Sequence, residues 1–204
     1  MSDRLSDAVT FRKLWRQEAP LYAAHLRRLN AEDWRARFMG TTNRRFARRH
    51  VDRIDWARAV VLGAFVDGRL RGVAELQPLR CTPEPEAELA ITVERRFQNR
   101  GIGSELMRRL ITAARNRGIK KLQLVAQPDN GRMRSLIRKF SGELRVEPGT
   151  AEAEIPMLPA SYATLLEESW QDTRGVGERL REALRPFGPE RLPLLLLDDR
   201  KQAA

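Results

Sequence analysis

The sequence predicts an α/β protein in which helices cover a mixed sheet. Its 204 residues suit one packed domain with an appendage and are short for two full domains. The 42% apolar content can support a core. The predicted order is strand, helices, three strands, helix, strand, helix and two strands, which is not the regular alternation of a doubly wound fold. We expect a domain over residues 1–158 and a helical appendage over residues 159–204.

The first part of the chain predicts one strand and three helices. Residues 9–15 form the strand, and an amphipathic helix begins near Pro20, because proline is tolerated in a first turn. Asn30 and Asn43 are each typical N-caps of a following helix. The outer side of the third helix carries Arg44, Arg45, Arg48, Arg49 and Arg53.

The middle of the chain predicts three strands. Residues 59–65 and 70–76 flank the tight-turn dipeptide Asp67-Gly68, which indicates a hairpin. Residues 87–93 form the next strand. Its alternation places Leu89, Ile91 and Val93 on one face and Glu88, Ala90 and Thr92 on the other.

The clearest helix runs over residues 102–117 and ends at Gly118. A strand over residues 121–126 follows, and Asn130 then caps another helix. Apolar residues at helical spacing predict the buried stripe of the first of these helices: Ile102, Leu106, Leu110 and Ala113.

The last part predicts a hairpin and two further helices. Residues 144–146 and 151–157 pair around Pro148-Gly149. In the appendage, residues 161–170 and 178–184 are helical, and the glycines of Arg174-Gly175-Val176-Gly177 separate them.

Composition indicates a cytoplasmic protein. Cys81 is the single cysteine, which excludes an internal disulfide and fits a reducing compartment. No apolar run approaches the roughly 18 residues of a membrane span, and the N-terminal residues do not resemble an export signal. We expect no metal, because no zinc-ligand spacing exists. His25 and His50 are expected to be packed or surface residues without a triad-like neighbour.

The stretch with the clearest chemistry is the loop after residue 93. Gly101-Ile102-Gly103 opens a helix, whose first turn leaves N–H groups unpaired at the positive end of the helix dipole. Glycine lets a phosphate approach the backbone without a Cβ in the way. A dinucleotide-binding loop would need glycine where Leu106 stands, and the lysine of a P-loop is absent. A glycine-rich turn without a ligand remains an alternative.

This loop resembles a known family. Gln98-x-x-Gly101-x-Gly103, directly after a strand ending in valine, is similar to the acyl-CoA motif of the GNAT superfamily of N-acetyltransferases. The strand over residues 122–126 and the helix headed by Asn130 resemble the elements that follow the motif in that fold. The resemblance implies a mainly antiparallel sheet of six to seven strands flanked by helices.

The same resemblance implies the ligand contacts. The pantetheine of acetyl-CoA, or of another short acyl-CoA, would pair with the backbone of Ile91 and Val93. Asn130 would touch the CoA arm. The pyrophosphate would lie on N–H groups of the loop and helix start: Gln98, Asn99, Arg100, Gly101, Ile102, Gly103 and Ser104.

The resemblance also implies an N-acyltransferase in which an acceptor amine attacks the thioester directly in a ternary complex. Glu88 is similar in position to the carboxylate that takes a proton from the amine in many members. Ile137 stands where many members carry a tyrosine that protonates the departing thiolate, and Ser141 is the one hydroxyl beside it.

Two other functions stay open. The absence of the tyrosine allows a non-catalytic acyl-CoA-binding regulatory protein. The formal net charge of +11 and the arginine-rich helix allow a binder of nucleic acid or of an acidic partner. The acceptor is unknown, and the leucine-rich tail makes a homodimer an expectation.

Overall fold

The computed structural model describes residues 9–38, 46–147 and 150–184, so the expected cap at Asn43 lies outside the described residues. The strands are β1 (Val9–Lys13), β2 (Val60–Val66), β3 (Arg69–Pro78), β4 (Glu86–Val93), β5 (Lys121–Ala126), β6 (Glu143–Glu147) and β7 (Thr150–Pro156). The helices are α1 (Ala19–Arg28), α2 (Ala31–Phe38), α3 (Phe46–Asp52), α4 (Ile102–Asn116), α5 (Gly131–Lys139) and α6 (Tyr162–Leu184).

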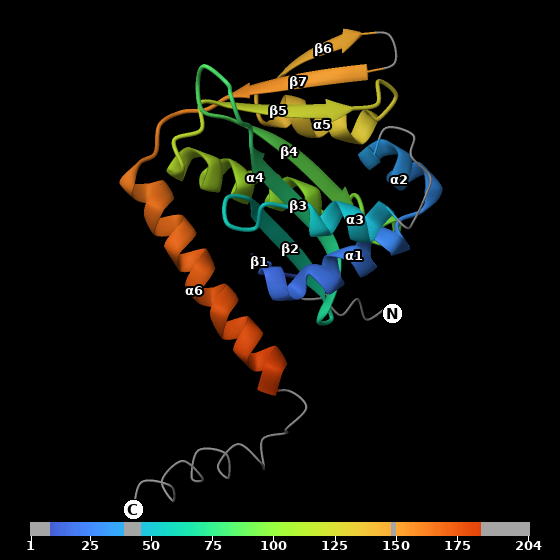
Figure 1. The fold of residues 1–204 in the computed structure, drawn as a ribbon, viewed down its shortest axis with the longest axis vertical. Helices are drawn as coiled ribbons and strands as arrows, with labels where there is room; N and C mark the ends of the chain where they lie inside the picture. The colour runs from blue at the N-terminus through green and yellow to red at the C-terminus, as the bar shows by residue number, and fades with distance from the viewer. Residues whose placement is uncertain (1–8, 39–45, 148–149, 185–204) are drawn as a thin grey trace, which may run out of the picture.

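The strands form one seven-stranded sheet in the order β1-β2-β3-β4-β5-β7-β6 (Figure 1). Every pair is antiparallel except β4 and β5, which are parallel. The mixed, mainly antiparallel sheet flanked by helices is therefore confirmed.

The β2–β3 hairpin turns at the predicted dipeptide. Asp67 has φ +52° and Gly68 has φ +71°. Two successive positive φ angles are typical of the type I′ turn, whose twist matches that of the flanking strands.

Helices cover both faces of the sheet. On one face, α4 buries its predicted stripe, and Leu106 and Leu110 are 0% exposed. On the other face, α1 to α3 pack Tyr22, Leu26 and Trp34 against the sheet. All seven residues of β2 are buried, because this strand lies between the two layers.

The two central strands separate along their length. β4 and β5 pair only at Glu86–Lys121, Ala87–Leu122 and Glu88–Gln123 within these described strands. Beyond that point β5 stays paired with β7, while β4 stays paired with β3. The sheet therefore opens between β4 and β5, and this opening positions the site.

The prediction of two C-terminal helices is wrong, because α6 is one continuous helix of 23 residues. Gly175 does not break it. A Cβ at Gly175 would lie 3.0 Å from the Cβ of Arg12, so the glycine allows α6 to lie close to β1. Neither α6 nor any other helix of the described residues combines the length and apolar character needed to cross a membrane.

Candidate active site

A cavity of about 280 Å³ lies in the opening between β4 and β5. The two strands, the loop before α4, and the helices α2 and α5 form its walls. The sequence-predicted residues that line it are Glu88, Ile91, Val93, Gln98, Asn99, Gly101, Gly103, Ser104 and Asn130. Two predicted residues do not line it: Arg100 is exposed above the ring of Phe97, and Ile102 is buried in the core.

The edge of β4 that faces the opening carries main-chain groups that do not pair with β3, although the carbonyl of Val93 accepts a hydrogen bond from Gln98 Nε2 at 2.8 Å. Hydrogen-bonded and non-hydrogen-bonded pairs alternate along an antiparallel ladder. The N–H of Glu94 donates to the carbonyl of Arg71 at 2.9 Å, so the pairs that Val93 and Ile91 make with β3 are of the non-hydrogen-bonded kind. The main-chain groups of Ile91 and Val93 therefore point away from β3 and toward the opening. An extended chain placed there can pair with β4 as a strand does.

The start of α4 forms an open set of donors at one end of the cavity. Asn99 and Gly101 have φ +58° and +81°, and the helix has no side-chain cap. The first intrahelical bond runs from the N–H of Glu105 to the carbonyl of Gly101 at 3.0 Å, which leaves the N–H groups of residues 102–104 outside the helical pattern. A Cβ on Gly103 would meet Val93 Cγ2 at 4.0 Å and no other atom outside its own helix and chain neighbours within that distance. This end of the cavity can hold an anion.

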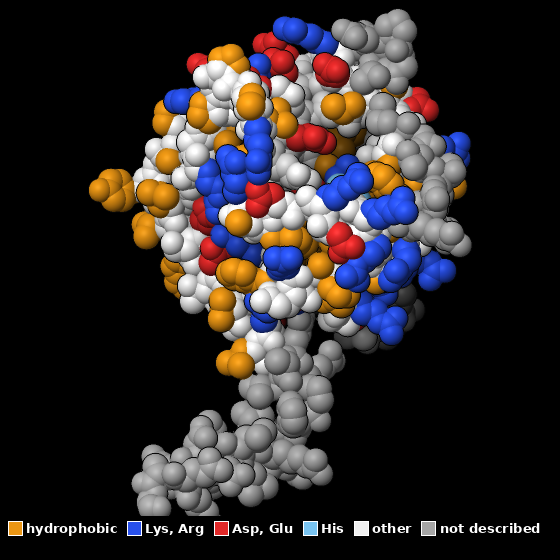
Figure 2. All heavy atoms as spheres, in the orientation of Figure 1, with side chains coloured by type: hydrophobic (Ala, Val, Ile, Leu, Met, Phe, Trp, Pro, Cys, Tyr) orange, Lys and Arg blue, Asp and Glu red, His pale blue; other side chains and the backbone are white. Residues whose placement is uncertain are grey.

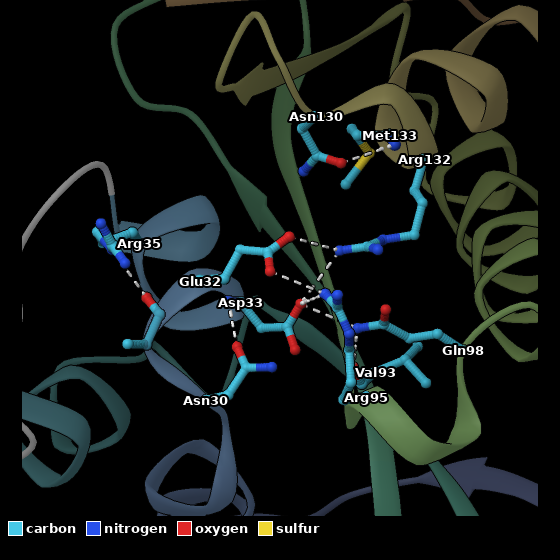
Figure 3. Close-up of polar contacts among 11 residues, drawn as sticks. Asn30, Glu32, Asp33, Arg35, Val93, Arg95, Gln98, Asn130, Arg132 and Met133 are labelled. Atoms are coloured by element: carbon cyan, nitrogen blue, oxygen red, sulfur yellow. Dashed lines mark hydrogen bonds and ion pairs between the residues drawn. The ribbon is translucent and has the colours of Figure 1, made fainter.

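The side chain of Gln98 holds this loop to the strand. Its Nε2 donates to the Val93 carbonyl at 2.8 Å and to Asp33 Oδ1 at 3.0 Å (Figure 3). The loop is thus connected both to the end of β4 and to α2. The motif glutamine therefore shapes the loop through its side chain.

Two carboxylates of α2 face two arginines across the mouth of the cavity (Figure 3). Glu32 lies 3.0 Å from Arg95 and 3.4 Å from Arg132. Asp33 lies 3.4 Å from Arg132 and 3.9 Å from Arg95. The hydrogen bond from Arg95 lowers the pKa of Glu32. We name Glu32, Asp33, Arg95 and Arg132 the mouth cluster; sequence analysis missed it, because its members come from three distant segments.

Glu88 is exposed in the cavity at the last paired position between β4 and β5. It shares a sheet face with Ala90, which is paired with Glu75 of β3. Arg37 of α2 also lines the cavity and interacts with both carboxylates. Burial lowers the pKa of Arg37, but the charges of Glu75 and Glu88 help to raise it above its usual value, so Arg37 stays cationic.

A buried polar network lies beneath Glu88. Glu75 accepts hydrogen bonds from Tyr22 Oη at 2.7 Å and His50 Nε2 at 3.0 Å, and Arg37 lies 3.5 Å away. Burial raises the pKa of Glu75, but the hydrogen bond from His50 and the charge of Arg37 outweigh it and bring that pKa to about 2. Glu75 is therefore an ionised carboxylate at neutral pH.

The expectation that neither histidine has a triad-like neighbour is wrong. His50 contacts Glu75, and His25 lies 3.3 Å from Glu94 and 2.9 Å from Thr92. Burial lowers the pKa of His25. Glu75 lies in β3 and Glu94 directly follows β4, 25 and 69 residues from their histidines, so local spacing in the sequence could not indicate these pairs.

The helix α5 contributes Asn130 and Met133 to the cavity wall. Asn130 Oδ1 accepts from the N–H of Met133 at 3.1 Å, which confirms its role as an N-cap. Ile137 is 0% exposed and packs in the core, while Ser141 is exposed. Neither of these two residues lines the cavity.

The arginine-rich face lies outside the cavity. Arg48, Arg49 and Arg53 are exposed, and Arg48 pairs with Asp52 at 2.9 Å. Figure 2 shows Lys and Arg side chains gathered over the region of α1 to α3. Arg44 and Arg45 lie outside the described residues.

With this geometry in place, comparison with known proteins decides the family. Residues 23–142 match the acetyltransferase (GNAT) family, and they include β4, the loop, α4, β5 and α5. The chain belongs to the GNAT family. An acetyltransferase of Pseudomonas aeruginosa is 34% identical over 85 residues, which are 41% of this chain and 46% of that relative. The chain thus matches about half the length of this curated relative.

Solved GNAT structures share the fold. The GNAT domain of S. lividans PAT has a TM-score of 0.64 at 22% identity and covers 72% of this chain and 89% of its own. An acetyltransferase structure from Salmonella typhimurium, with its cofactor acetyl-CoA, has a TM-score of 0.59 at 15% identity. The match covers 76% of this chain and 96% of the Salmonella chain. An N-acetyltransferase of Thermoplasma acidophilum in complex with coenzyme A has a TM-score of 0.55 at 16% identity. The match covers 73% of this chain and 99% of the Thermoplasma chain.

Proposed function

We propose that this GNAT protein transfers an acetyl or other short acyl group from acyl-CoA to an amine. The observation that carries the proposal is the opening between β4 and β5, with the uncapped start of α4 at one end. An acyl-CoA molecule has an extended amide-bearing arm and a pyrophosphate, which match these two features. Membership of the GNAT family and the CoA ligands of two structural neighbours support the same ligand.

The proposed contacts follow from the geometry. Pantetheine amides pair with the outward main-chain groups of Ile91 and Val93. The pyrophosphate accepts hydrogen bonds from the loop and the first turn of α4, residues 98–104, with Arg100 and Ile102 contributing main-chain groups alone. Asn130 lies on the opposite wall of the cavity and contacts the CoA arm beside its capping bond.

Catalysis on this scaffold is mostly positioning. Holding a thioester beside an amine makes the attack effectively intramolecular, and this can lower the barrier by about 7–11 kcal/mol at most. A lysine-like amine has a pKa near 10.4, so it must lose a proton before it attacks at neutral pH. We assign Glu88 to accept that proton, directly or through water, because it is exposed in the cavity where the two strands part.

The first experiment is calorimetric titration of acetyl-CoA into the wild type and two Gly103 variants. Gly103→Glu adds bulk and negative charge where the pyrophosphate should lie, so it should abolish binding. Gly103→Ala is the matched control, because a Cβ there meets nothing closer than Val93 Cγ2 at 4.0 Å. The proposal fails if the wild type does not bind acetyl-CoA, or if Gly103→Glu binds as tightly as Gly103→Ala.

A regulatory acyl-CoA-binding protein is the second candidate, and the burial of Ile137 favours it. No tyrosine stands at this position, and the side chain there faces the core. Release of free CoA thiol, measured over a broad panel of amines, separates the two candidates. Binding with no release above the hydrolysis background would favour the regulatory protein.

A further inference from the structure

The helix α6 packs on the protein through its polar face. Glu168 pairs with Lys13 of β1 and Arg117 beyond α4, both at 2.9 Å, and Asp172 lies 2.6 Å from Lys13. Glu167 pairs with Arg108 of α4. An amphipathic helix of a globular protein normally turns its apolar face toward the core. In α6 this orientation is reversed.

The apolar face of α6 is left in solvent. At 100° per residue, its large apolar residues fall on one stripe along the helix. They are between 47% and 89% exposed. In Figure 2, hydrophobic side chains follow the edge of the molecule where Figure 1 places α6. We name this set the α6 stripe: Tyr162, Leu165, Leu166, Trp170, Val176 and Leu180.

We propose that the α6 stripe binds the α6 stripe of a second copy of this chain, with the two helices antiparallel. The first reason is the symmetry of its sequence. Leu166 and Leu180 lie seven residues on either side of Thr173, and Trp170 and Val176 lie three residues on either side. A two-fold axis at Thr173 therefore places Leu166 opposite Leu180 of the partner subunit, and Trp170 opposite Val176 of the partner subunit.

Small residues occupy the middle of the stripe. Ser169, Thr173 and Gly177 are exposed and recur every four residues, so they lie on the same side of α6 as the large apolar residues. Short side chains at the crossing point let two helix axes approach to about 8–10 Å. The larger side chains on either side of Thr173 can then interdigitate with those of the partner helix.

Charge favours the antiparallel orientation. The first half of α6 carries Glu167, Glu168 and Asp172 without a basic residue. The second half carries three arginines and two glutamates, which leaves one net positive charge, and Arg181 has an 81% exposed side chain that lies 3.4 Å from Glu178. The three acidic residues already pair with cations of their own chain, so charge contributes through the net sign of each half. Antiparallel helices bring the net acidic half of each copy beside the net basic half of the other, whereas parallel helices would align halves of like sign.

The stripe is also large enough for a stable contact. At 1.5 Å per residue, α6 is about 34 Å long. Tyr162 and Trp170 together can bury on the order of 300 Å² or more. Each partner in a stable interface buries roughly 800 Å². A stable dimer therefore requires the four aliphatic side chains and their neighbours to bury the remaining area, roughly 500 Å² per partner.

Sedimentation of the full chain from about 1 to 100 µM tests the proposal. We expect a dimer whose dissociation constant rises at least about tenfold in Leu166→Glu, because the substitution buries a charge at the contact. Leu21→Glu is the matched control, since Leu21 of α1 is similarly exposed at 45% and lies off the stripe. It should leave the dimer unchanged. Circular dichroism checks that each variant is folded.

A cysteine pair tests the two-fold axis itself. In a Cys81→Ser background, Thr173→Cys should form a disulfide-linked dimer on mild oxidation. Ala163→Cys, exposed on the same helix, should not. A wild type that is monomeric at 100 µM overturns the proposal. This holds whether hydrogen exchange then finds the α6 stripe open to solvent or protected by residues 185–204. A dimer that Leu166→Glu does not weaken also overturns it.

Discussion

Asp33 Oδ1 accepts a hydrogen bond from Nε2 of Gln98 at 3.0 Å, which joins α2 to the motif loop. Asp33 and Glu32 also pair with Arg95 and Arg132 at the mouth of the cavity. Asp33 and Arg132 line the cavity, and the two carboxylates neutralise cations that would attract an anionic ligand. The two carboxylates of the mouth cluster are therefore expected to compete with acyl-CoA for Arg95 and Arg132.

Removing one carboxylate charge from the mouth cluster should tighten acyl-CoA binding. In Asp33→Asn the acceptor oxygen for Gln98 remains, while one negative charge is lost. We expect the affinity for acetyl-CoA to rise about three- to tenfold at low ionic strength and to approach that of the wild type at high salt, since salt screens the attraction between the ligand and the exposed side chains of Arg95 and Arg132. Calorimetry at two salt concentrations measures this, with Asp55→Asn, whose exposed carboxylate pairs with Arg80, as control. Weaker binding would instead mean that the Asp33 charge is needed to hold the loop in its binding conformation.

Replacing the proposed base should slow the chemistry without weakening the ligand. For an acceptor that supports CoA release, Glu88→Gln should lower kcat about 10²- to 10⁴-fold and leave the KM for acyl-CoA nearly unchanged. Glu84→Gln, in the exposed loop before β4, is the control. A variant that keeps full kcat would remove Glu88 from the mechanism.

Glu75 should contribute stability that depends on pH. Its pKa falls from 4.5 to about 2 on folding, so the unfolded chain binds more protons between these values. The contribution is fully present above pH 4.5 and is lost as pH falls through about 2. A shift of this size corresponds to about 3 kcal/mol. Urea unfolding measures the free energy of unfolding across this pH range, and it should depend less on pH in Glu75→Gln than in the wild type. Equal slopes for the two proteins would contradict the lowered pKa of Glu75.

Sequence reasoning found the parts of the site that are contiguous in the chain. The loop at Gln98, the helix start at Gly103 and the N-cap at Asn130 depend on local spacing, and the structure places all three at the cavity. The network around Glu75 and the mouth cluster could not be predicted in this way. Their members, such as His50 and Arg132, meet only after the sheet and helices have packed.

The wrong prediction of a helix break at Gly175 has a similar cause. Glycine in a helical pattern suggests a break, but its intrinsic cost of about 1 kcal/mol can be outweighed by a close contact. The backbone of α6 approaches Arg12 at this residue. Only the tertiary structure shows that a Cβ there would crowd Arg12.

The two glycines of α6 should therefore respond oppositely to alanine. Gly177→Ala should stabilise the protein by about 0.5–1 kcal/mol, because a Cβ there meets nothing within 4 Å. Gly175→Ala should destabilise the protein by about 1 kcal/mol, because the close contact between the new Cβ and Arg12 costs more than the gain in helix propensity. Thermal unfolding at low protein concentration compares the monomers, and a stabilised Gly175→Ala would show that α6 does not need this close approach.

The contact between α6 and β1 also has a consequence during synthesis. Lys13 and Glu168 are 155 residues apart in the chain, and translation at about 5–20 residues per second needs roughly 8–30 s to span them. For that time β1, the strand at one edge of the sheet, lacks the helix that covers it. A nascent chain that stalls before Tyr162 would present an open strand edge to its neighbours on the same polysome, where aggregation competes with completion of the fold.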